Sequence, residues 1–283
     1  MPDAQELTAL LAGVSYRAIN NSTEGLTPFR HLLEMDRDGV VVTFLEQALD
    51  TLAGGERAGI AFVLAEHYRK TGHLTLLQNL YALDDPQVKG AVLNGLWGEP
   101  GASPEMGPGI VALAIEGAAH PAPGVRTEAS FVFQNQCAWG VDVTAALGPL
   151  LRLLGDPEWR VRHQAAYATG NVAKRKYDLT PHIAPLTLNL AHENLFVRAA
   201  SAWALRQLSR RHNIAPAIGA LAHILASDDD YNAPRKRAAG ALLYHARKSA
   251  ENLKAVKGNL ASVSLNPNYK EVARFLKQLT EAG

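Results

Sequence analysis

The sequence predicts an all-α fold, a solenoid of about seven helical hairpins preceded by an atypical N-terminal cap. Three observations lead to this prediction. The 46 alanines and 39 leucines make up about 30% of the chain, and both residue types are strong helix formers. Apolar residues recur at the 3.6-residue helical period, without the alternation that is typical of strands. A basic residue also returns about every 36 residues, which indicates an internal repeat.

The repeat is clearest in residues 156–168 and 194–205. Each stretch carries a Val-Arg pair, then a small residue three positions after the arginine, then an alanine-rich run. Aligning the whole chain on that basic residue gives seven anchors, separated by 32 to 37 residues: Arg57, Lys89, Arg126, Arg162, Arg198, Arg235 and Lys270.

Each unit is predicted to contain two helices, one before the anchor and one that carries it. Residues 147–154, 183–191 and 214–226 have the apolar pattern of first helices. In the second helix of the fourth unit, one buried face is expected to hold Val161, Ala165, Ala168 and Val172. Turn-forming residues mark the link between the two helices at Asp85-Pro86, Pro123-Gly124, Asp156-Pro157 and Asp228-Asp229-Asp230.

The ends of the array differ from its middle. Residues 1–50 are predicted to form N-terminal capping helices, with helical patterns at 6–11 and 40–52, and residues 51–283 to form the repeats. Residues 98–109 are so rich in glycine and proline that we expect a surface loop or hinge between the second and third units.

The pattern Asp-Pro-x-x-x-Val-Arg-x-x-Ala-x-x-Ala at 156–168 resembles HEAT repeats, particularly the short bacterial kind. Pro149 and Pro185, thirteen residues before their anchors, are similar to the kinking proline of that family's first helix. The resemblance covers about residues 50–283 and implies an armadillo-type superhelix. His120 and His192 stand where the family has aspartate, which puts the family's Asp-to-Arg ladder between repeats in doubt.

Function in a solenoid usually lies on the concave face that the second helices line. Positions five, nine and twelve residues after the anchors fall on one helical stripe, opposite the buried alanines and valines. From the third to the sixth unit this stripe presents three rows. They are an aromatic row (Phe131, Tyr167, Trp203), a largely amide row (Asn135, Asn171, Gln207, Tyr244) and a basic row (Lys174, Arg210, Arg247).

Aromatic rings beside amides and cations suit a peptide backbone or stacked bases, so the stripe is a candidate binding surface. The alternative is that the aromatic rings pack between neighbouring second helices and form a spine of the array.

Charge divides the chain in two. Residues 1–149 hold 8 basic and 17 acidic residues, a net charge of −9, whereas residues 150–283 hold 20 and 10, a net charge of +10. A basic half attracts phosphates or acidic proteins, although two solvated faces would also explain the division. Opposite halves could further recognise each other head to tail, so we expect a monomer or a weak head-to-tail oligomer.

Arg235-Lys236-Arg237 begins a second helix, the end at which positive charge is unfavourable. These three residues are therefore candidate anion contacts, unless residues 228–230 neutralise them locally.

Motifs for catalysis and metal binding are absent from the sequence: it has no glycine-rich phosphate loop, His-Glu-x-x-His, Gly-x-Ser-x-Gly or Cys-x-x-Cys. Glu116 and His120 alone have the spacing of a helical metal pair, and two ligands do not make a site. Cys137 is expected to be a small buried hydrophobe. We therefore expect no cofactor and no metal, and favour a non-enzymatic protein.

The first functional hypothesis is a HEAT-repeat scaffold or adaptor that binds a protein partner through its concave face. The alternative is nucleic-acid binding by the basic half, similar to the HEAT-like alkylpurine DNA glycosylases, which place a carboxylate among groove aromatics. Across all seven units, the positions five, nine and twelve residues after the anchors hold a carboxylate only at Glu66, in the first unit, which counts against that alternative. Without a signal peptide or an apolar transmembrane stretch, and with one cysteine, a cytoplasmic protein that does not enter the membrane is expected.

Overall fold

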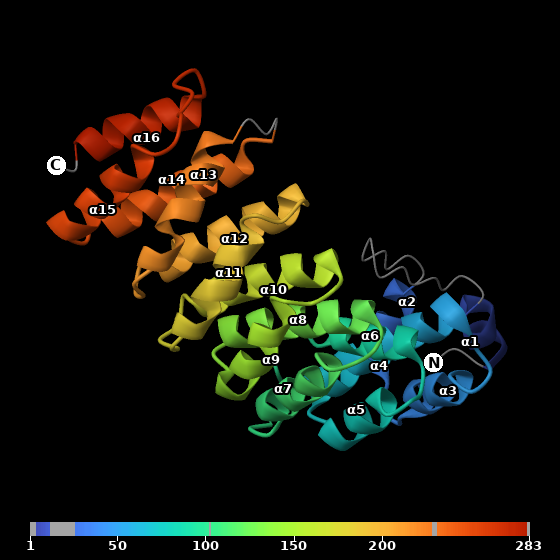
Figure 1. Cartoon of the computed structure of the whole chain (residues 1–283). Helices are drawn as coiled ribbons and strands as arrows, with labels where there is room; N and C mark the ends of the chain where they lie inside the picture. Colours follow the sequence, from blue (N-terminus) through green and yellow to red (C-terminus); the bar gives the residue numbers. More distant parts are fainter. Residues whose placement is uncertain (1–3, 12–25, 102, 228–230, 282–283) are drawn as a thin grey trace. The chain divides into compact units, whose positions relative to one another are not determined.

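The computed structural model describes residues 4–11, 26–101, 103–227 and 231–281, and every regular element in these ranges is a helix (Figure 1). The helices group into two compact units, residues 1–145 and 146–283, which are described separately. No charged residue lies between 145 and 149, so the units themselves carry the net charges of −9 and +10.

In the first unit, α4, α6 and α8 pack side by side, with α5 and α7 against them and α2 and α3 against α4. The helices are α1 (Ala4–Leu11), α2 (Thr27–Met35), α3 (Val40–Ala48), α4 (Gly54–Thr71), α5 (Leu74–Tyr81), α6 (Pro86–Gly95), α7 (Met106–Gly117) and α8 (Pro123–Ala138).

In the second unit, α10, α12, α14 and α16 pack in chain order, and the helices between them form the other layer (Figure 1). The helices are α9 (Leu147–Leu153), α10 (Trp159–Val172), α11 (Ile183–Asn189), α12 (Leu195–Leu208), α13 (Ile218–Ala226), α14 (Ala233–Ala246), α15 (Ala250–Leu260) and α16 (Lys270–Thr280).

The predicted fold class is confirmed, because all seven anchors lie on second helices, from α4 to α16. Val161, Ala165, Ala168 and Val172 are fully buried, as their spacing on α10 predicts. The links begin the second helices as their turn-forming residues suggest. Asp85, for example, accepts hydrogen bonds from the backbone N–H groups of the first turn of α6.

A short 3₁₀ turn precedes three of the first helices: Thr144–Ala146, Thr180–His182 and Ala215–Ala217. Pro149 and Pro185 follow two of these turns as the third residue of α9 and α11. A proline in the first turn removes no helical hydrogen bond, since that N–H has no partner inside the helix. The prolines thus stand where the chain changes from 3₁₀ to α geometry.

The N-terminal region and one loop differ from the sequence-based expectation. The helix α2 was not predicted. The helix α3 ends at Ala48, four residues before the end of the helical pattern predicted for residues 40–52. The helix α7 begins at Met106, inside the expected loop 98–109, because its glycines allow close packing: a Cβ on Gly107 would lie 3.0 Å from Val141. The predicted turn at 228–230 lies outside the described residues.

Several anchors bind carbonyl oxygens at the end of the preceding first helix or in its link. Arg126 donates to the carbonyls of His120 (2.9 Å) and Pro121, and Arg198 repeats this geometry. Lys89 donates to the Tyr81 carbonyl at 2.6 Å, and Arg235 to the Ser227 carbonyl at 3.0 Å. Carbonyls at a helix C-terminus have no partner inside the helix and favour a cation, so each of these four anchors closes its own hairpin.

The residue six positions before the anchor has the same local role in three of the repeats. Asp156, His120 and His192 each accept a hydrogen bond from the backbone N–H two residues further on. The Nε2 atom of His192 also contacts the guanidinium of Arg162, the anchor of the preceding repeat. A neutral imidazole has one lone pair and one N–H, so His192 cannot accept from both groups, whereas an aspartate could.

Substitution of His192 by aspartate should therefore stabilise the second unit. A carboxylate accepts from the Asn194 N–H and from Arg162 at once, which we expect to raise the free energy of unfolding by about 1 kcal/mol. His192→Asn is the matched control, because its amide oxygen keeps the turn while its NH₂ faces the guanidinium. Urea unfolding at pH 7 compares the three proteins. Equal stability of the Asp and Asn variants would mean that the contact with Arg162 contributes nothing.

Candidate binding surface

Two residues of the predicted aromatic row, Tyr167 and Trp203, lie together on second helices of the second unit. Tyr167 on α10 and Trp203 on α12 are half-buried, with ring centroids 5.1 Å apart and ring planes tilted by 44°. Tyr244 on α14, which the sequence analysis placed in the largely amide row, has 37% of its surface exposed. The helical period therefore brings these three side chains to one face of three neighbouring second helices.

Trp203 has both a packing role and a surface role. Its indole lies on Gly170 of α10, where a Cβ atom would overlap the ring. This agrees with the packing alternative, since the indole fills space between two second helices, but the side chain remains partly exposed. Gly170 therefore lets a large ring lie flat across α10.

Cations from neighbouring positions cover the aromatic rings. Arg237 of α14 lies 5.3 Å from the Tyr167 ring on α10, and Lys174 lies 5.8 Å from the Trp203 ring. Arg206 and Arg210 of α12 lie 5.7 and 5.1 Å from the Tyr244 ring. Such cation–π contacts hold the cations in place while leaving their N–H groups able to bind other acceptors.

The arginines of this surface lower the pKa values of the titratable groups beside them. The Arg210 guanidinium, assisted by its hydrogen bond at 3.4 Å, lowers the pKa of the Tyr244 hydroxyl. Burial, followed by the charge of Arg237, lowers the pKa of His163, which stands beside Tyr167 with ring centroids 4.9 Å apart. Both effects favour the neutral form of the His163 ring.

The amide row is less accessible than the sequence suggests. Gln207 is buried on α12, and Asn171 is half-buried, its Oδ1 accepting from Lys174 Nζ at 2.7 Å. Lys174, Arg210 and Arg247 are exposed, as a basic row requires.

Phe131 and Asn135 of the predicted rows belong to α8 in the first unit, where both are half-buried. Phe131 packs against Trp97 at a centroid distance of 4.4 Å. Glu128 on the same helix is buried, and desolvation raises its pKa to about 8 against the opposing effect of Trp97 and Asn94. Sequence reasoning missed this carboxylate, because it lies two residues after the anchor rather than on the predicted stripe.

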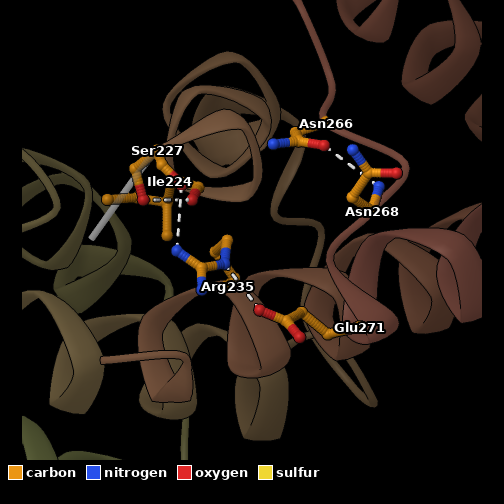
Figure 2. Close-up of polar contacts among 6 residues, drawn as sticks. All are labelled: Ile224, Ser227, Arg235, Asn266, Asn268 and Glu271. Carbon is orange, nitrogen blue, oxygen red and sulfur yellow. Dashed lines mark hydrogen bonds and ion pairs between the residues drawn. The ribbon is translucent and has the colours of Figure 1, made fainter. Parts of the chain in front are cut away.

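Arg235 is corrected from an anion-contact candidate to a structural residue (Figure 2). Only 2% of its surface is exposed, its Nε lies 2.6 Å from Glu271 Oε1, and Tyr269 covers its guanidinium at 4.0 Å. Its Nη1 also donates to the Ser227 carbonyl. Lys236 is exposed and Arg237 is half-buried. Asp228, Asp229 and Asp230 lie outside the described residues.

A cavity of about 470 Å³ opens between α12, α14 and α16. Lys236 and Arg247, both identified from the sequence, line it. Arg206, Lys270 and Arg274 also line it, and sequence reasoning missed their role. Lys270 and Arg274 are four residues apart and so share one face of α16. The predicted stripe did not include them, because they stand at the anchor and four residues after it.

A second aromatic set lies where the second helices begin. Phe196 and Tyr231 are 49% and 44% exposed, and Phe196 contacts both Trp159 (6.4 Å between centroids) and Tyr231 (6.1 Å). These residues precede their anchors by different numbers of positions, so no fixed spacing could have identified them.

Neither a membrane helix nor a metal-binding cluster is found in the described ranges. None of their helices is both long and apolar enough to cross a membrane. Within the same residues, no three His, Cys, Asp or Glu side chains gather as a metal ion would require.

Comparison with known proteins identifies the repeat. The HEAT repeat family model matches residues 146–175, which form α9, the link and α10. Residues 146–175 therefore form a HEAT repeat. No curated protein matches it in sequence.

Solved structures share the fold of this helical-repeat chain at low sequence identity. An engineered protein is 19% identical with a TM-score of 0.64, and the match covers 99% of this chain and 83% of the engineered one. A designed armadillo repeat protein in complex with the peptide (KR)4 is 20% identical with a TM-score of 0.60, covering 74% and 98%.

The buried carboxyl of Glu128 predicts a pH dependence for the first unit. Its folded pKa lies above the unfolded value, so the free energy of unfolding should fall as pH rises from about 4.5 to about 8. Glu128→Gln keeps the shape of the protonated group and should raise the free energy of unfolding at pH 8 by more than about 1 kcal/mol.

Unfolding curves at pH 5 and pH 8 test this prediction, with Glu116→Gln on α7 as the exposed control. A Gln variant as pH-dependent as the native protein would contradict it.

Proposed function

We propose that this HEAT-repeat protein is a non-enzymatic scaffold or adaptor that binds a segment of a protein partner on the face formed by α10, α12 and α14. The observation that carries the proposal is the cluster of Tyr167, Trp203 and Tyr244, whose rings lie beside cations of neighbouring helices. Tyrosine, tryptophan and arginine are the residues that dominate the energy of protein interfaces. The single cysteine fits a reducing compartment, so we place this scaffold in the cytoplasm.

The arrangement suits an extended peptide. Rigid aromatic side chains offer contact area at little cost in conformational entropy, and guanidinium groups donate to backbone carbonyls. The designed armadillo protein with the same fold was solved with a peptide bound, which supports a peptide ligand for this architecture.

Nucleic-acid binding is the second candidate, because the second unit carries a net charge of +10. Base stacking, however, requires open ring faces. Tyr167 and Trp203 face each other, and two arginines lie near the Tyr244 ring. The protein ligand is therefore the better supported candidate.

A selection from a random peptide library on the full-length protein tests the proposal. Enriched peptides should bind the protein in solution. The double variant Tyr244→Ala/Arg210→Ala, which changes two exposed side chains, should weaken that binding by at least about tenfold. Leu188→Ala on α11, 77% exposed in the other layer, is the control and should leave binding unchanged.

Failure to enrich any peptide over an unrelated protein would contradict the proposal. So would tight binding of single- or double-stranded oligonucleotides that weakens steeply with salt and is lost in the double variant, since that result would favour the nucleic-acid candidate.

A further inference from the structure

The cavity between α12, α14 and α16 has a strongly cationic wall. Arg206, Lys236, Arg247, Lys270 and Arg274 all line it. Among the described residues that line it, Glu271 is the single carboxylate, and it is already bound to Arg235. A wall with five cations and one engaged carboxylate favours an anionic occupant.

Arg206 brings an incompletely paired guanidinium to this wall. Its Nε is buried and has no hydrogen-bond partner among the described residues. Leaving such a donor unpaired costs free energy, and a carboxylate is a strong acceptor for a guanidinium.

Packing holds Arg206 in place. A Cβ on Gly240 would lie 2.7 Å from Arg206 Cδ and Nε, so the side chain lies directly on the backbone of α14. The Tyr244 ring is 5.7 Å from its guanidinium. An anion in the cavity would therefore meet the terminal N–H groups of a guanidinium that is already positioned, which lowers the entropic cost of binding.

The cavity adjoins the surface described above, because Tyr244 and Arg206 belong to both. A peptide on that surface could place an acidic side chain in the cavity. Given the proposed function, on which this inference rests, we infer that the cavity binds the carboxylates of an acidic segment in the protein partner, rich in aspartate and glutamate.

Fluorescence anisotropy with a labelled Asp-Glu repeat peptide tests this inference on the full-length protein. Peptides of equal length with Lys-Arg and Ser-Gly repeats serve as probes of charge. The acidic peptide should bind and the other two should not.

Two charge-reversal variants locate the binding. Lys236→Glu/Arg274→Glu changes two exposed residues of the cavity wall and should weaken binding of the acidic peptide by at least about tenfold. Lys254→Glu/Lys257→Glu makes the same change in charge on exposed positions of α15 and should weaken it by much less. Arg206→Met removes the unpaired donor and should also weaken binding, with circular dichroism confirming that each variant is folded.

Equal losses in the two double variants would overturn the inference, because they would show attraction by net charge alone. So would binding of inorganic phosphate or of an oligonucleotide in preference to the acidic peptide. A second copy of the chain, offering its acidic first unit, is a different occupant: a dimer in light scattering at low salt that the cavity variants abolish would replace the inference.

The library selection separates this inference from the proposed function. Enriched peptides that lack acidic residues and bind the cavity variants normally would refute the acidic segment and leave the scaffold proposal standing.

Discussion

The hairpins depend on one recurring interaction, the hydrogen bond from an anchor cation to the carbonyls at the end of the helix before it. A chain of short helices exposes many terminal carbonyls, and each of them needs a partner. Arg126 and Arg198 bind two link carbonyls each, and Lys89 and Arg235 bind one. With the links closed in this way, second helices lie side by side and present the same positions to the same face. The surface of the second unit follows from that regularity.

The same regularity separates folding from recognition within each second helix. On α10 the alanines and valines at one set of positions are buried, while Tyr167 lies on the opposite side and Lys174 follows the helix as an exposed residue. Charge is divided at a larger scale, since the two compact units carry net charges of opposite sign. The basic unit holds the aromatic cluster and the cationic cavity, so the groups that could contact a partner are concentrated in residues 146–283.

The fold was predictable because helical period and anchor spacing are local properties that the sequence displays directly. For this reason all seven anchors lie on second helices. For the same reason Tyr167, Trp203 and Tyr244 lie on one face of these helices. Other features depend on neighbours from different repeats. The burial of Arg235 arises from Glu271 and Tyr269, more than thirty residues away, and the depth of Gln207 from packing around α12. Arg206 enters the cavity only because position 240 is a glycine, a coincidence between two helices that no single-helix pattern contains.

The two glycines under large side chains have a consequence for how this protein can diverge. At most surface positions a HEAT repeat can exchange one exposed side chain for another without disturbing its packing. Gly170 and Gly240 are different, since a methyl group at either would displace Trp203 or Arg206 from the neighbouring helix. Evolution toward a new ligand could therefore replace the exposed cations without a loss of stability. A substitution of either glycine would instead change the stability and the ligand-binding surface together.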